Sequence, residues 1–140
     1  MPIDISLTSN SAVLELNWEK LSIPVALSVD TNSLFLSNAK DAVAKAKPDD
    51  WRTPLTAARY LYDNKYAPGD AAAFLDKSLS IKETFANLST KAGVLADQGK
   101  KKEAVAAAQK ALALKDTDPK PSADAVADLE KKLAEWKAAK

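Results

Sequence analysis

The sequence predicts a mainly α-helical protein with a short N-terminal antiparallel β meander, followed by an antiparallel helical array and a capping helix. Up to about residue 30, hydrophobic residues recur at every second position, as in a half-buried strand. Beyond it they recur at helical spacing, and this helical part repeats internally. We therefore expect a β-strand extension over residues 1–30 and a helical domain over residues 31–140.

The N-terminal part has the pattern of three short strands. Alternating hydrophobic residues occupy residues 3–7, 13–18 and 23–29, and the turn-forming stretches "TSNS" and "EK" separate them. Pro24 has no N–H, which favours an edge strand or a bulge at that point. A lone three-stranded sheet needs a partner for its apolar face. We expect that partner to be the helices, another copy, or a β-domain outside this chain.

Six helices follow, each marked by a hydrophobic stripe. The stripes lie within residues 35–46, 53–64, 71–79, 85–96, 104–112 and 126–136. Gly99 is predicted to end the fourth helix, since glycine is preferred just past a helix end. The stripe of the last helix includes Trp136, which we assign to the core. The predicted N-caps are Asn32 or Ser33, Thr53 with Pro54 in the first helical position, Asp70, and Ser122.

The helical part contains an internal repeat with a shift of 33 positions. "DAAAFLDKSLSIKET" (70–84) falls on "EAVAAAQKALALKDT" (103–117) without a gap. With the same shift, Tyr66 falls on Gly99 in the turn before this segment. A repeat of this length indicates stacked helical hairpins.

The second copy resembles the tetratricopeptide repeat. In "ADQGKKKEAVAAAQKALALKDTDP", Gly99 takes the place of the turn glycine, and Ala104 and Ala111 take the places of small packing residues. The first copy departs from the motif with Tyr66 and Ser78. The resemblance implies one good repeat, one degenerate repeat and a capping helix. It also implies a concave groove lined by the first helix of each pair, with Thr53, Thr56, Tyr60, Asp63, Ala86, Ser89, Gly93 and Ala96.

A wider resemblance covers most of the chain. The segments "LELNWEKLSIPVALSVD", "DDWRTPLTAARYLYDN" and "LDKSLSIKETFANLSTKAGVLADQGKKKEA" are similar to the C-terminal part of a bacterial family of unknown function. In that family a β-domain precedes tetratricopeptide-like helices. The resemblance implies a periplasmic or secreted location and makes residues 1–30 the remnant of a larger β-domain. It carries over no catalytic residue.

The composition of the chain argues against several classes of catalytic and binding site. The chain has no Cys and no His, which removes disulfides, thiol catalysis and the commonest general base and metal ligand. Three glycines cannot build a glycine-rich phosphate loop, and a net charge of +1 gives no electrostatic reason to bind nucleic acid. The start of the chain lacks the pattern of a signal peptide, and no apolar run is long enough to span a membrane. We expect no enzyme, no cofactor and no metal.

Two groups of residues are candidates for binding a partner. Lys100, Lys101 and Lys102 form a basic run that would suit an acidic partner, although we favour a solvated turn as their explanation. Arginine and aromatic residues are common interface anchors, although the tryptophan could instead pack internally while the arginines pair with nearby aspartates. This second group consists of Trp51, Arg52, Arg59 and Tyr60.

Together these features predict a non-enzymatic protein–protein interaction or scaffolding module that binds a protein or peptide. The alternative is a structural helical region that supports a ligand-binding or enzymatic β-domain. The open strands at residues 2–29 further predict a homodimer through this segment.

Overall fold

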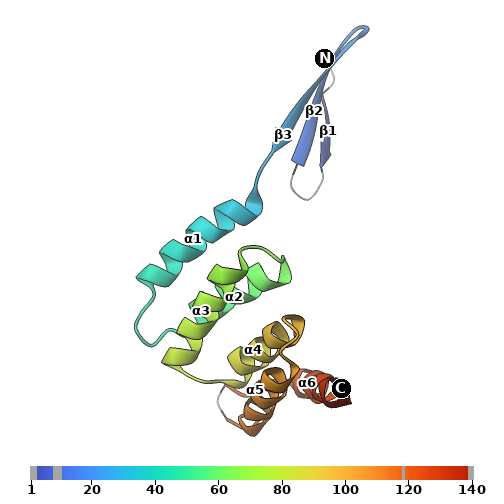
Figure 1. Cartoon of the computed structure of the whole chain (residues 1–140). Coiled ribbons are helices and arrows are strands. Elements are labelled where there is room, and N and C mark those ends of the chain that lie inside the picture. Colours follow the sequence, from blue (N-terminus) through green and yellow to red (C-terminus); the bar gives the residue numbers. More distant parts are fainter. Residues whose placement is uncertain (1–2, 8–10, 118, 139–140) are drawn as a thin grey trace. The chain divides into compact units, whose positions relative to one another are not determined.

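The protein is described here by a computed structural model covering residues 3–7, 11–117 and 119–138. Within these residues it is mainly helical, with a three-stranded antiparallel sheet followed by six helices (Figure 1). The predicted fold class is confirmed. The chain divides into two compact units, residues 1–38 and 39–140, and the division falls inside the first helix.

The sheet is a simple meander. It consists of β1 (Ile3–Leu7), β2 (Ser11–Trp18) and β3 (Leu21–Ser28), in the order β1-β2-β3. The strands of both neighbouring pairs run antiparallel, and Leu14 of the central strand lies opposite Ile5 and Val25. The period-two pattern therefore gave both the strands and their order.

The first helix, α1 (Thr31–Lys45), begins at a cap that the sequence analysis missed. The amide of Ser33 donates to the Asp30 carboxylate at 3.0 Å, so Asp30 is the cap rather than Asn32 or Ser33. The C-terminal half of α1 belongs to the second unit, where Val43 is buried.

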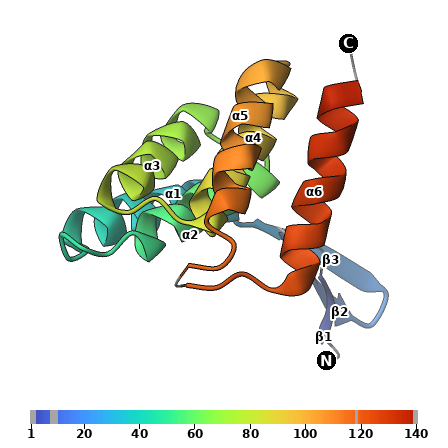
Figure 2. The same cartoon turned by 90° about the horizontal axis from the view of Figure 1, so that it is seen from below.

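The helical unit contains two antiparallel hairpins and a final helix. The first hairpin is α2 (Arg52–Asp63) with α3 (Pro68–Ile81), and the second is α4 (Phe85–Asp97) with α5 (Lys101–Ala113). The final helix, α6 (Ala123–Ala138), packs on α5 and closes the array (Figure 2). Helices α4, α5 and α6 share one core, to which α4 contributes Phe85, Leu88 and Leu95 as its large side chains.

The N-caps of α2 and α3 differ from those predicted. Asp50 accepts the amides of Arg52 and Thr53 at 3.0 and 3.1 Å and the Thr53 hydroxyl at 2.6 Å. These hydrogen bonds, the hydroxyl one first, hold the pKa of Asp50 below its usual value. Thr53 is therefore a donor inside α2. Helix α3 starts at Pro68, which places Asp70 within its first turn rather than at the cap.

The other two predicted helix ends are correct. Ser122 accepts the amide of Ala125 at 3.2 Å and so caps α6. Gly99 follows the end of α4 with a φ of 77°, in the left-handed region that glycine favours. The amides of Gly99 and Lys100 donate to carbonyls of the last turn of α4, each at 2.9 Å.

The two interhelical turns share this geometry but differ in length. After α2, the amides of Lys65 and Tyr66 donate to carbonyls of the last turn at 3.0 and 2.9 Å, and Lys65 has the positive φ, 51°. Lys65, rather than Tyr66, therefore takes the place of Gly99. The turn 64–67 is one residue longer than the turn 98–100, so Lys65 and Gly99 are 34 positions apart, whereas the starts of α2 and α4, and those of α3 and α5, are each 33 apart.

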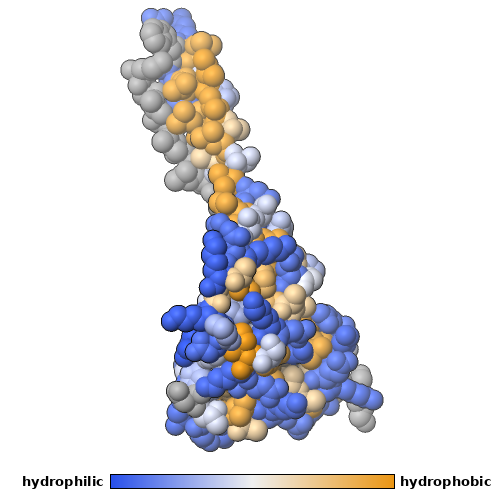
Figure 3. All heavy atoms as spheres, turned by 90° about the vertical axis from the view of Figure 1, so that its left-hand side faces the viewer, coloured by the Kyte–Doolittle hydropathy of each residue, from blue (hydrophilic) through white to orange (hydrophobic). Residues whose placement is uncertain are grey.

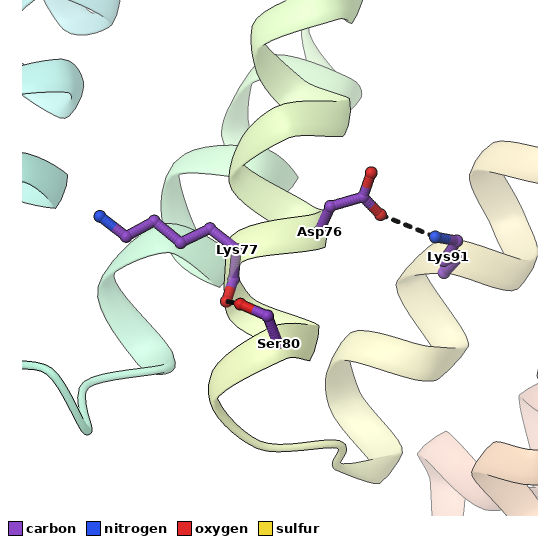
Figure 4. A network of polar contacts seen from close by, with 4 residues as sticks. All are labelled: Asp76, Lys77, Ser80 and Lys91. Carbon is purple, nitrogen blue, oxygen red and sulfur yellow. Dashed lines mark hydrogen bonds and ion pairs between the residues drawn. The ribbon is translucent and has the colours of Figure 1, made fainter.

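Polar contacts link α3 to α1 and to α4. Lys77 donates to the carbonyl of Val43 in α1 at 3.0 Å, while Asp76 pairs with Lys91 of α4 at 2.7 Å. Figure 4 shows the side chains of Asp76 and Lys77 leaving α3 in opposite directions, with the Ser80 hydroxyl on the Lys77 carbonyl. The exposed ion pair between Asp76 and Lys91 adds little to stability.

A buried polar joint connects the two hairpins. Asn87 in the first turn of α4 is fully buried. Its amide nitrogen donates to the Ser78 hydroxyl at 3.1 Å and to the Lys82 carbonyl at 2.8 Å. Its carbonyl oxygen accepts the amide of Thr84 at 2.8 Å, which completes a capping box. Ser78 in turn donates to the carbonyl of Trp51 at 2.8 Å. This chain of bonds joins the start of α2, the end of α3 and the start of α4.

Candidate functional site

A groove runs along the first helix of each hairpin and the final helix. Alternate helices α2, α4 and α6 line it, and its volume is about 240 Å³. This alternation follows from hairpin stacking, because each hairpin turns the same helix toward the same side of the array. The predicted groove thus has a counterpart in the structure.

Small side chains of α4 form part of the groove lining. Ser89, Thr90 and Gly93 all line it, and the two hydroxyl groups donate to the carbonyl of Ala86 at 3.0 and 2.8 Å. A Cβ atom on Gly93 would lie 3.6 Å from the Tyr62 hydroxyl, an ordinary contact. The glycine therefore leaves space beside Tyr62 that any side chain would fill.

Charged side chains line the groove from α2 and α6. Arg59 and Asp63 come from α2, and Asp128 and Lys132 come from α6. Lys132 and Asp128 form an ion pair at 2.8 Å within α6. Within the described part of the chain, Arg59 has no ion-pair partner within 4.0 Å, so its guanidinium can pair with a bound molecule.

Two aromatic residues complete the lining. Trp136 of α6 is partly buried, packs against the core as predicted, and also faces the groove. Tyr62 of α2 donates its hydroxyl to the Asp97 carboxylate of α4. Burial raises the pKa of Tyr62 well above its usual range, and the bond to Asp97 raises it further. Tyr62 also lines a second hollow of about 520 Å³ near the α2–α3 turn, so this bond fixes a side chain shared by both hollows.

The predicted groove residues are brought together only in part. Asp63, Ser89 and Gly93 line the groove, whereas the other five, Thr53, Thr56, Tyr60, Ala86 and Ala96, are not among its lining residues. The sequence analysis treated α6 as a cap and therefore missed Asp128 and Lys132. The two residues could have been noticed as a pair, because an acidic and a basic side chain four residues apart lie on the same face of a helix.

The two predicted partner-binding groups lie in different surroundings. Trp51 is buried, with only 7% of its surface exposed, and the Arg52 guanidinium lies 4.6 Å from its ring centroid. Arg59 lies in the groove, so the two arginines do not form one patch with Trp51. Tyr60 is half-buried on α2.

The lysine run lies in the turn between α4 and α5. Lys100, Lys101 and Lys102 are exposed, and the first turn of α5 also contains Glu103. All three lysines lie outside the groove lining. Their placement fits the solvated-turn interpretation.

Comparison with protein-family models, curated proteins and solved structures finds no match to this chain. Among the described residues, no group of three or more acidic, His or Cys side chains is arranged to hold a metal ion. The helices of the described segments are all too short or too polar to cross a membrane.

Proposed function

We propose that this chain is a non-enzymatic interaction module that holds a peptide segment of a protein partner in the groove of α2, α4 and α6. The observation that carries the proposal is the combination of small residues along α4 with charged residues on both flanking helices. The groove volume of about 240 Å³ is below the roughly 300–1,000 Å³ of small-molecule pockets. It suits a few side chains of a peptide better than a whole small molecule.

The charges of the groove indicate the chemistry of the segment. Arg59 and Lys132 are balanced by Asp63 and Asp128, so the groove as a whole is neutral. A partner segment with both acidic and basic side chains would match it, since electrostatic complementarity mainly sets specificity. An acidic residue of that segment would pair with Arg59, whose guanidinium lacks an ion-pair partner among the described residues.

Peptide selection from a random displayed library tests this proposal. We expect enriched peptides of mixed charge, and we expect Arg59→Glu to weaken their binding about tenfold, which is 1.4 kcal/mol. Arg52→Glu is the matched control, because it makes the same change on the same helix outside the groove lining. Failure to enrich any peptide, or equal losses in the two variants, would refute the proposal.

A second candidate function rests on the sheet. The hydrophobic residues of β3 are exposed, with Leu21 at 60% and Leu27 at 53%, so the sheet face lacks a cover. A helical region that supports a ligand-binding or enzymatic β-domain would explain such a face. A longer reading frame that encodes more strands before residue 1 would support this candidate, and a start codon fixed at residue 1 would contradict it.

The same open strands support a homodimer through residues 2–29. Sedimentation across a concentration series tests it, and a monomer at the highest concentration would contradict it. The resemblance to an exported bacterial family suggests a periplasmic or secreted location. Cell fractionation of the native organism would test that location.

A further inference from the structure

The outer edge of β3 is a poor template for another strand. β3 lies at the edge of the sheet and pairs one-to-one with β2, with Pro24 opposite Glu15. Because a proline inside a ladder must turn its missing N–H side away from its neighbour, the gap in donors lies on the open edge. An added strand would lose a hydrogen bond and meet the pyrrolidine ring in the middle of β3.

The opposite edge of the sheet, β1, is also a poor template for another strand. The described part of β1 has the sequence IDISL and includes one charged residue, Asp4. Charged residues on an edge strand are among the devices that prevent edge-to-edge pairing. Both edges of this sheet therefore disfavour an added strand.

One face of the sheet, in contrast, is apolar and open. Leu21, Ile23, Val25 and Leu27 alternate along β3 and are between 38% and 60% exposed. Residues that lie opposite each other in an antiparallel pair share a face, and β2 presents Ala12, Leu14 and Leu16 opposite Leu27, Val25 and Ile23. Figure 3 shows the resulting strip of hydrophobic atoms on this unit. The described positions of this face contain no charged residue.

We infer that a second copy of this chain covers this apolar face, and that the two sheets pack face to face rather than edge to edge. The inference rests on the proposed homodimer through residues 2–29. A two-fold interface must be complementary to itself, and an uncharged apolar face meets that condition without like charges coming together. A strongly charged partner would find no opposite charge on it.

The size of the face limits the strength of the dimer. Strands of five, eight and eight residues, at about 3.3 Å per residue and about 4.8 Å between strands, give a flat face of roughly 330 Å² for each copy. The two faces together are on the order of 700 Å², below the 1,200–2,000 Å² of stable interfaces. We therefore expect a weak, reversible dimer.

Paired substitutions on the two faces of β3 test the inference. Ile23→Asp places a charge on the apolar face, and Ala26→Asp places the same charge on the opposite face of the same strand. Sedimentation equilibrium should show a dissociation constant at least about 100-fold higher for Ile23→Asp, because the interface would bury an unpaired charge. Ala26→Asp should change it less than about threefold. Circular dichroism of both variants checks that each remains folded.

Cysteine cross-linking gives a readout that tolerates some loss of stability. The chain has no cysteine, so Val25→Cys and Ala26→Cys each provide a single reactive thiol. A short bis-maleimide should link Val25→Cys into dimers far faster than Ala26→Cys.

The experiments distinguish failure of the homodimer from failure of the assignment of its interface to the apolar face. If the unmodified chain is monomeric at every concentration, the homodimer and the face assignment both fail. If it dimerises but the two aspartate variants behave alike, or if Ala26→Cys cross-links as fast as Val25→Cys, the homodimer stands and the face assignment is wrong.

Discussion

Removal of the Asn87 side chain should weaken the attachment of the second helical hairpin to the first. Asn87→Ala deletes both amide donors and the carbonyl acceptor of the buried joint. The amide of Thr84, a buried residue, would then lose its bond to the Asn87 carbonyl oxygen, and the carbonyl of Lys82, an exposed residue, would lose its bond to the Asn87 amide nitrogen. The variant tests whether this joint, and not helix packing alone, holds α4 against α3.

The size of the effect follows from the bonds. Three hydrogen bonds are lost, and each contributes about 1 kcal/mol to the free energy of unfolding. We expect a loss of about 3 kcal/mol, which would lower the melting temperature by roughly 10 °C for a domain of this size. Asn64→Ala is the matched control, because it removes one exposed bond to the carbonyl of Tyr60. That change should cost less than about 0.5 kcal/mol.

Urea unfolding followed by far-ultraviolet circular dichroism measures both variants. The slope of the transition should stay unchanged while its midpoint falls, since a local loss of bonds does not alter the surface exposed on unfolding. If Asn87→Ala costs as little as Asn64→Ala, the joint makes no net contribution and the reasoning is wrong. A lower slope with an unchanged midpoint would instead indicate that the hairpins unfold separately.

The remaining predictions concern two turns and one titrating group. Lys65→Gly should raise the free energy of unfolding by about 1 kcal/mol and Gly99→Lys should lower it by about the same amount, because both residues have a positive φ; urea unfolding measures both. Asp97→Asn should lower the pKa of Tyr62, measured by ultraviolet absorbance titration. Since the folded-state pKa of Tyr62 lies above the usual 10.0, its contribution to stability is fully present below that pH and is lost as the pH rises beyond it. Asp97→Asn should therefore reduce the loss of stability at high pH, and an unchanged pH dependence would contradict the assignment.

The elements were predictable because burial imposes a period on the sequence. The sheet has one apolar face, so its strands alternate, and each helix of the second unit buries one stripe. The helix ends were less predictable, because several side chains near each end could accept the same amide. At α2, Thr53 was the predicted cap, but the structure makes Asp50 the acceptor and Thr53 the donor.

The groove was predictable where it depends on the repeat and not where it depends on α6. The resemblance to the tetratricopeptide repeat placed eight residues in a groove, and three of them, Asp63, Ser89 and Gly93, line the groove of the structure. Asp128 and Lys132 have no equivalent in the shift of 33, because the connection before α6 is longer than the other connections of the array. Their position depends on how α6 packs on α5, which the sequence pattern does not specify.

The departures of the first hairpin from the repeat motif have physical causes in the structure. Ser78 stands where the second hairpin has Ala111, and both are fully buried. A buried hydroxyl without a partner would be unfavourable, but Ser78 donates to the carbonyl of Trp51 and accepts from Asn87. Ser78 therefore contributes hydrogen bonds to the joint between the hairpins, and it does not merely replace the small alanine that the repeat motif has at this position. A residue that departs from a repeat motif should be judged by the neighbours it meets, because each hairpin packs against a different pair of surfaces.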